Sequence, residues 1–252
     1  QENNMTNQNK RVILVTGASR GVGKGIAEGM ARKEDIIICA ARSKKKGSTV
    51  QQFGFEIKSS LDETVEKIKA KGANGIAYPI DLNNQKEILE LSGYIKKEFG
   101  RLDLLIHSAC QIHDDLVESK PYWEKSVDLW SVMDVGLKSN YLLSHALTPL
   151  MIESKGKLIV QISSHGAMCY MHGPIYGAQK AGIDKMAFDM AYDLKPHDIC
   201  SLSLWSGIVK DEKTQKVSEM HGKQYAEFLK GAASQEYAGL VINELYDDQE
   251  LM

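Results

Sequence analysis

Two groups of residues have the types and spacing needed to bind a nucleotide and to move a proton. The first is the stretch TGASRGVGKGIA at Thr16–Ala27, where Gly17, Gly21 and Gly23 give the spacing T-G-x-x-x-G-x-G. It follows the apolar run Val12–Val15 and leads into a helical pattern. Strand, glycine-rich turn and helix in this order present backbone N–H groups and a helix N-terminus to a pyrophosphate. Taken alone, the stretch equally fits a plain turn between a strand and a helix.

The second group is Tyr176 and Lys180, four residues apart in a helical pattern that follows Pro174. This spacing places the phenol and the ammonium on one face of a helix. A cation beside a phenol favours the phenolate, so the tyrosine can exchange a proton with a carbonyl or alcohol oxygen as hydride moves. Just upstream, Ser163 and Ser164 end a strand-like run, where a hydroxyl could reach the same crevice. By itself, the pair of Tyr and Lys equally fits a solvated helix face.

Alternating strand-like and helical segments must position these groups. The strand-like runs are Val12–Val15, Ile36–Ala40, Gly75–Ile80, Leu102–Ile106, Leu158–Ile162 and Ile199–Leu204. The helical patterns are Gly23–Arg32, Leu61–Lys71, Gln85–Phe99, Leu129–Glu153, Tyr176–Leu194 and Gln235–Tyr246. Apolar strands separated by helices predict an α/β fold with a doubly wound, mostly parallel sheet of the Rossmann type. Its ligand crevice is expected at the carboxyl ends of the strands.

The chain has no internal repeat and no linker that would divide it. We therefore expect residues 1–10 to form a polar N-terminal tail and residues 11–252 to form one dinucleotide-binding catalytic domain. The stretch Ser43–Ser60 is long for a connection between a strand and a helix. It is predicted to be an irregular insertion on the cofactor side of the sheet.

Composition excludes several classes of function. A formal net charge of −2, with 25% charged residues, argues against a nucleic-acid or membrane-surface binder. No apolar run is long enough to span a bilayer, and the first ten residues lack the apolar core of a signal peptide. The four cysteines lie far apart, with no metal-ligand spacing, so we expect free thiols, no metal site and a cytoplasmic location.

With these motifs in place, the chain resembles the short-chain dehydrogenase/reductase family. The resemblance rests on TGASRGVG at Thr16–Gly23, Asp81-Leu82 after the third strand, ISS at Ile162–Ser164 and YGAQK at Tyr176–Lys180, in the order typical of the family. From Trp130 through LSLWSGIV the chain is most similar to the animal dehydrogenase/reductase member 1 subgroup. The family resemblance implies an oxidoreductase that transfers hydride between a nicotinamide and a carbonyl or alcohol substrate.

The resemblance also implies roles for individual residues. Tyr176 is expected to be the catalytic acid/base, and Lys180 to lower the pKa of Tyr176 and to bind the nicotinamide ribose. Ser164 is expected to hydrogen-bond the substrate oxygen, with Ser163 as the alternative. The residues expected to contact the cofactor are Gly17, Ser19, Arg20, Gly21, Val22, Gly23, Arg42, Asp81, Leu82, Ser108, Ala109, Tyr176, Lys180, Gly207 and Ile208.

The charge of the residues that follow the second strand indicates whether the cofactor is NAD(H) or NADP(H). An NAD enzyme of this type usually has an acidic residue there, to accept hydrogen bonds from the ribose hydroxyls. This chain has Ala41 at that position, followed by Arg42, and Arg20 lies in the glycine-rich stretch. Two guanidinium groups can bind a 2′-phosphate through charge-assisted bonds. We therefore predict NADP(H) as the cofactor.

Several positions depart from the family pattern. The usual N-N-A-G is replaced by H-S-A-C at His107–Cys110, in which only Ala109 is kept. Gly136 stands where the family has a catalytic asparagine that kinks its helix. Glycine permits the kink without a side chain, and Asn140, one turn later, is a candidate to compensate. The threonine expected four residues after Gly207 is missing. Asp81 fits an adenine contact, a helix N-cap, or both.

The resemblance further implies features outside the reacting residues. Residues Ile208–Gly231 are expected to form a flexible loop that closes over substrate. A homodimer or homotetramer is expected, with an interface formed by the helices Leu129–Glu153 and Tyr176–Leu194. The apolar residues of the second helix either contact a partner subunit or pack on the sheet of their own chain. These residues are Ile183, Met186, Ala187 and Met190. A last edge strand is usual in the family, and this sequence offers none after Tyr246; either the sheet lacks that edge, or the sequence omits residues.

Two hypotheses of different classes follow. The first is an NADP(H)-dependent carbonyl reductase or alcohol dehydrogenase acting on a small molecule. The second is a nucleotide-binding sensor or scaffold with little turnover, which Gly136 and the altered loop after the fourth strand motivate.

Overall fold

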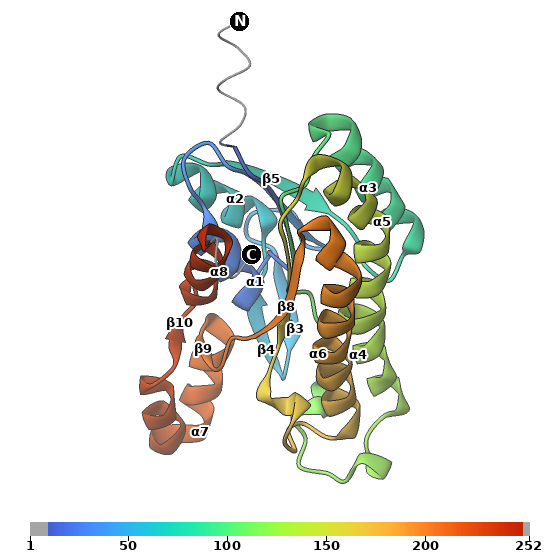
Figure 1. The fold of residues 1–252 in the computed structure, drawn as a ribbon. Helices are drawn as coiled ribbons and strands as arrows, with labels where there is room; N and C mark the ends of the chain where they lie inside the picture. Colours follow the sequence, from blue (N-terminus) through green and yellow to red (C-terminus); the bar gives the residue numbers. More distant parts are fainter. Residues whose placement is uncertain (1–9, 249–252) are drawn as a thin grey trace, which may run out of the picture.

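A six-stranded parallel sheet forms the centre of the molecule, with strand order β5-β2-β1-β6-β7-β8 (Figure 1). The computed structural model describes residues 10–248, without the side chains of residues 220–226 and 228. The expected tail, residues 1–10, therefore lies almost wholly outside the described residues. The strands of the central sheet are β1 (Val12–Thr16), β2 (Ile36–Ala41), β5 (Asn74–Pro79), β6 (Leu104–His107), β7 (Leu158–Ser163) and β8 (Cys200–Trp205).

Helices cover both faces of this sheet, as the buried apolar runs of its strands require. One face carries α1 (Gly21–Met30), α2 (Leu61–Ala70) and α8 (Tyr237–Asp247). The other carries α3 (Gln85–Phe99), α5 (Ser139–Ser154) and α6 (Pro174–Leu194), seen to the right in Figure 1. The doubly wound α/β fold expected from the sequence is confirmed. Among the described helices, none has the length and apolar character needed to cross a bilayer.

The helix expected over Leu129–Glu153 is interrupted, and Gly136 is the reason. A short α4 (Ser131–Met133) is separated from α5 by a broken turn, in which Val135 is extended and Gly136 has φ +130°. A side chain is strained at that φ, and a Cβ on Gly136 would lie 2.3 Å from Nε2 of Gln179. The kink expected at this glycine is therefore present.

The insertion Ser43–Ser60 is irregular mainly in its first part, so the expectation of an irregular segment was partly wrong. Its second half forms an antiparallel hairpin of β3 (Thr49–Gln52) and β4 (Phe55–Lys58). The two residues between them both have positive φ, as a type I′ turn requires: 52° at Phe53 and 79° at Gly54. In the view of Figure 1 the hairpin lies between α6 and α7 (Glu212–Lys230).

The stretch Ile208–Gly231 is largely helical, which corrects the expectation of a flexible loop. It holds β9 (Val209–Lys210) and α7 (Glu212–Lys230), and β10 (Ala233–Ser234) pairs with β9. Helix α7 begins at a reciprocal cap: Asp211 accepts the N–H of Thr214, and the Thr214 hydroxyl accepts the N–H of Asp211. Within residues 10–248, β8 is one edge of the central sheet.

Candidate active site

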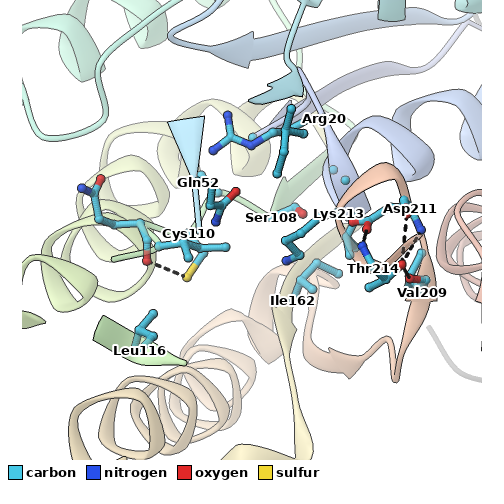
Figure 2. A pocket seen from close by; sticks show the side chains of 18 of the residues that line it. Arg20, Gln52, Ser108, Cys110, Leu116, Ile162, Val209, Asp211, Lys213 and Thr214 are labelled. Atoms are coloured by element: carbon cyan, nitrogen blue, oxygen red, sulfur yellow. Dashed lines mark hydrogen bonds between the residues drawn. The ribbon is translucent and has the colours of Figure 1, made fainter. Parts of the chain in front are cut away.

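A cleft of about 1500 Å³ opens at the carboxyl ends of the strands, the position expected for a doubly wound sheet. Figure 2 shows part of its lining. Every site residue expected from the sequence lines this cleft: Gly17, Ser19, Arg20, Gly21, Val22, Gly23, Arg42, Asp81, Leu82, Ser108, Ala109, Ser164, Tyr176, Lys180, Gly207 and Ile208. The fold thus gathers residues as far apart in the sequence as Gly17 and Ile208 into one space.

Ser164 and Tyr176 are in hydrogen-bond contact. The Ser164 Oγ lies 3.2 Å from the Tyr176 Oη, and either atom can be the donor. Ser164 follows the last residue of β7, and Tyr176 lies in the first turn of α6, so strand and helix ends bring the two hydroxyls together. A substrate oxygen placed between them would receive two hydrogen bonds.

Ser163 faces away from this pair. Its hydroxyl is buried and donates to the carbonyl of Lys180 at 3.3 Å. Adjacent residues of a strand point to opposite faces of the sheet, which accounts for the difference between the two serines. The geometry favours Ser164, and not Ser163, as the hydroxyl that meets Tyr176.

Lys180 lies beside the ring of Tyr176. Its Nζ is 5.5 Å from the ring centroid and donates to the carbonyl of Ile162 at 3.3 Å. The side chain is 6% exposed, so the ammonium is held in place by its surroundings. Burial raises the pKa of Tyr176, and the hydrogen bond from Ser164 offsets this only in part. The net effect is a raised pKa, so the lowering expected from Lys180 is not seen in this structure.

His172 is a further neighbour of the tyrosine. The two rings meet edge to face, with centroids 5.1 Å apart. Burial lowers the pKa of His172, and the charges of Lys213 and Lys125 lower it further. The imidazole is thus neutral near pH 7 and forms one wall beside Tyr176.

The glycine-rich turn leaves room for the backbone to approach a ligand. A Cβ on Gly23 would lie 2.4 Å from the carbonyl oxygen of Gly17, so a side chain here would disrupt the turn. The loop after β6 is tied to this turn, because the Thr16 hydroxyl accepts the N–H groups of Ser108 and Ala109 at 3.1 and 3.2 Å. The Ser108 Oγ is buried without a hydrogen-bond partner among the described residues. A buried hydroxyl without such a partner, next to the glycine-rich turn, is suited to hydrogen-bond a polar ligand such as a dinucleotide.

Two guanidinium groups meet at the end of the cleft near β2. Burial and the neighbouring Arg42 lower the pKa of Arg20, and Asp211 partly opposes this. Arg20 donates to the Ser59 hydroxyl at 3.1 Å, and Ser59 bonds Ser19 at 3.0 Å. Paired cations with serine hydroxyls form a site suited to a phosphate.

Asp81 does not cap α3, which corrects one of the two roles considered for it. The N-cap is Asn84, whose side chain accepts the N–H of Lys86. Asp81 instead accepts the N–H of Asn83 at 3.0 Å, in a short turn at the edge of the cleft.

Gln179 fills the space beside the kink, a role that the sequence did not suggest. Its side chain is fully buried, and its Nε2 donates to the carbonyls of Val132 and Val135. Asn140, the residue expected to compensate for Gly136, donates instead to Gln161 at 3.1 Å. Gln179 therefore joins the broken turn to α6, one residue before Lys180.

The hairpin and α7 supply walls of the cleft that sequence reasoning missed. The Phe53 N–H donates to Asp114 at 2.9 Å, and the Lys216 ammonium bonds the carbonyl of Glu56. The alternation in TVQQFGFEIK around Gly54 is a hairpin signal. Asp211 and Thr214, three residues apart, are a helix-start signal.

Comparison with known proteins identifies similar chains. The family described as short chain dehydrogenase matches residues 11–222. The human protein called Dehydrogenase/reductase SDR family member 1 is 30% identical over 255 aligned positions, covering 97% of this chain and 77% of that protein. A 3-oxoacyl-[acyl-carrier-protein] reductase FabG of Buchnera aphidicola is 30% identical over 223 positions, covering 87% of this chain and 81% of its own.

Solved structures have the same fold. L-sorbose reductase from Gluconobacter frateurii, in complex with NADPH and L-sorbose, matches with a TM-score of 0.78 at 19% identity, over 96% of this chain and 91% of that chain. The 3-oxoacyl-[acyl-carrier protein] reductase of Brucella melitensis, in complex with NAD, matches with a TM-score of 0.79 at 20% identity, over 97% and 92%.

Proposed function

The chain belongs to the short-chain dehydrogenase/reductase family, and we propose that it is an NADP(H)-dependent carbonyl reductase or alcohol dehydrogenase. The family makes it an oxidoreductase that uses a nicotinamide cofactor. The choice of NADP(H), the acid/base role of Tyr176 and the carbonyl or alcohol substrate are the parts that we propose.

The observation that carries the proposal is the contact between Ser164 and Tyr176 beside Lys180, in the same cleft as the glycine-rich turn. A bound nicotinamide supplies or accepts the hydride. Tyr176 gives its phenolic proton to the carbonyl oxygen in reduction and takes it back in oxidation. Ser164 hydrogen-bonds the same oxygen. Lys180 stabilises negative charge as it develops on the phenol.

The preference for NADP(H) is supported by charge. Arg20 and Arg42 lie together at the cleft, with the hydroxyls of Ser19 and Ser59 between the glycine turn and α2. The position expected to be acidic in an NAD enzyme is Ala41, which also lines the cleft. The two guanidinium groups would bind the 2′-phosphate of NADP(H). The ribose hydroxyls of NAD(H), in contrast, would have no carboxylate at position 41 to accept their hydrogen bonds.

The alternative function, a nucleotide sensor with little turnover, predicts a different response to one substitution. We expect Tyr176→Phe to lower the turnover of a carbonyl substrate by about 10²- to 10⁴-fold while leaving the Kd for NADPH nearly unchanged. The exposed Tyr170→Phe, outside the cleft, is the control and should retain full activity. Wild-type protein that binds NADPH but turns over no carbonyl in a broad panel would favour the sensor.

A homo-oligomer is also proposed through the expected helices, but of the residues expected there only Met186 lines a hollow on their outward side. Ile183 and Ala187 are 1% and 2% exposed, because α6 packs on β7 and β8 through them. Four aromatic side chains are instead exposed: Trp130 in the turn before α4, Tyr141 in α5, and Phe188 and Tyr192 in α6. The hollow, of about 450 Å³, is lined by Trp130, Tyr141 and Met186 among others. A second copy of the chain would cover this apolar face.

A further inference from the structure

A carboxylate lies against the glycine-rich turn, where a pyrophosphate would bind. A Cβ on Gly21 would be 3.2 Å from Oδ2 of Asp211. Asp211 is 7% exposed, and its Oδ1 accepts the N–H of Thr214 at 2.8 Å, which fixes the carboxylate at the start of α7. This is the position where the family resemblance led us to expect a threonine.

Such a carboxylate opposes the binding of any phosphate at the turn. Two like charges in a partly buried cleft repel one another strongly, since solvent screens them less than it does at the surface. Arg20 interacts with Asp211 electrostatically, but its guanidinium also faces Arg42 and Ser59 at the other end of the cleft. A further cation close to Asp211 is needed for tight binding.

Lys213, two residues after Asp211 in the chain, lines the same cleft and is the candidate for this cation. Its side chain is half-buried. Figure 2 shows it extending from the first turn of α7 toward the centre of the pocket, between Ser108 and Ile162 in this view. Within the described part of the chain, no hydrogen bond or ion pair occupies its ammonium. Its charge also acts on His172, the histidine that packs against Tyr176.

We propose that Lys213 binds the pyrophosphate of the dinucleotide and offsets the charge of Asp211. This rests on the proposed function, since it presumes that a nicotinamide dinucleotide occupies the cleft. The ammonium donates to phosphate oxygens that NADPH and NADH share. Lys213 therefore contributes to affinity for both dinucleotides, whereas Arg20 and Arg42 contribute to the choice between them.

The test is the Kd of NADPH and of NADH for the full-length protein, measured by fluorescence titration without substrate. We expect Lys213→Met to raise both Kd values by about tenfold and by the same factor. Lys213→Arg, which keeps the charge, should restore most of the affinity. The control is Lys210→Met, because Lys210 is exposed, lies outside the cleft and bonds the carbonyl of Lys230. It should leave both Kd values unchanged.

A second variant tests the role of Asp211. Asp211→Asn keeps a side chain that can cap α7 but removes the charge, so both Kd values should fall. Combined with Lys213→Met, it should recover part of the lost affinity. The proposal is overturned if Lys213→Met changes neither Kd, changes only that of NADPH, or lowers turnover with both Kd values intact. Wild-type protein that binds neither dinucleotide would instead contradict the proposed function.

Discussion

Tyr176 is the residue on which the proposed chemistry depends, and its burial has a consequence for pH dependence. Burial raises the pKa of the phenol above its ordinary value, so the side chain is protonated between about pH 6 and pH 9. Reduction uses the protonated phenol, and its rate at saturating substrate should be flat over this range. Oxidation uses the phenolate, and its rate should rise by about tenfold per pH unit.

The measurement is kcat in both directions as a function of pH, with Ser164→Ala as a comparison. Loss of the Ser164 hydroxyl removes the one hydrogen bond that lowers the pKa of Tyr176, so the alkaline limb should move to higher pH. A reductive rate that falls with an apparent pKa near 7 would show that Lys180, and not burial, controls the phenol.

Gln179 is expected to position the catalytic helix. Its amide donates to the carbonyls of Val132 and Val135, directly before Lys180 in the chain. Gln179→Leu keeps the volume but leaves a buried and a partly buried carbonyl without this donor. We expect kcat to fall by about tenfold, together with a loss of about 1–3 kcal/mol in stability. The matched control is Gln161→Leu, a second fully buried glutamine, bonded to Asn140 away from Tyr176. It should lose similar stability at unchanged kcat.

The two variants separate a positioning role from a structural one. Thermal unfolding gives the stability of each variant, and initial rates give kcat. If Gln179→Leu and Gln161→Leu lose stability but retain equal kcat, Gln179 only supports the fold.

At the scale of elements, His107 ties β6 to α5 through a bond of 2.8 Å between its Nε2 and the Ser144 Oγ. Complete burial lowers the pKa of His107 to about 3. The unfolded chain therefore binds one more proton than the folded protein between about pH 6.5 and pH 3. The contribution of His107 to the free energy of unfolding is fully present above about pH 6.5. It decreases by about 1.4 kcal/mol for each pH unit below that value.

Urea unfolding at a series of pH values measures this slope. His107→Asn should flatten it over this range, whatever its effect on stability at pH 7. The exposed His145→Asn is the control and should retain the wild-type slope. An unchanged slope in His107→Asn would assign the acid sensitivity to other groups.

The central strands and most helices could be predicted from the sequence because their apolar patterns are long and continuous. Two segments were missed for different physical reasons. The hairpin over β3 and β4 is held partly by distant contacts, such as that of Phe53 with Asp114, and short polar strands show weak periodicity. Helix α7 was expected to be a loop by analogy, although the reciprocal cap of Asp211 and Thr214 signals a helix start.

Contacts between residues of different helices and strands could not be predicted from the spacing of residues along the sequence. Asn140 lies on a plausible face of its helix, but a buried amide needs a partner, and Gln161 is the one within reach. Ile183 and Ala187 form an apolar stripe whose periodicity does not distinguish the sheet from a partner chain. The motif residues gathered at the cleft because parallel strands bring their carboxyl ends to one edge.

At the scale of the whole molecule, the exposed aromatics of α5 and α6 predict an oligomer. Phe188 and Tyr192 are 72% and 81% exposed on the outward face of α6. We expect Phe188→Glu combined with Tyr192→Glu to give a monomer, because buried carboxylates would oppose association. Light scattering coupled to gel filtration measures the mass. Leu89→Glu, an exposed apolar residue of α3, is the control and should leave the assembly intact. A wild-type monomer would contradict this interface.

The proposed enzyme binds NADP(H) through Arg20 and Arg42 and reduces carbonyl compounds at Tyr176. The most direct test is one titration of NADPH and NADH against wild-type protein and Arg42→Ala, with carbonyl-dependent oxidation of NADPH followed in the same samples. We expect tighter binding of NADPH than of NADH, loss of that preference in Arg42→Ala, and turnover of a simple dicarbonyl or quinone. Equal affinity for the two dinucleotides, or tight binding of NADPH without turnover of any carbonyl, would contradict this proposal.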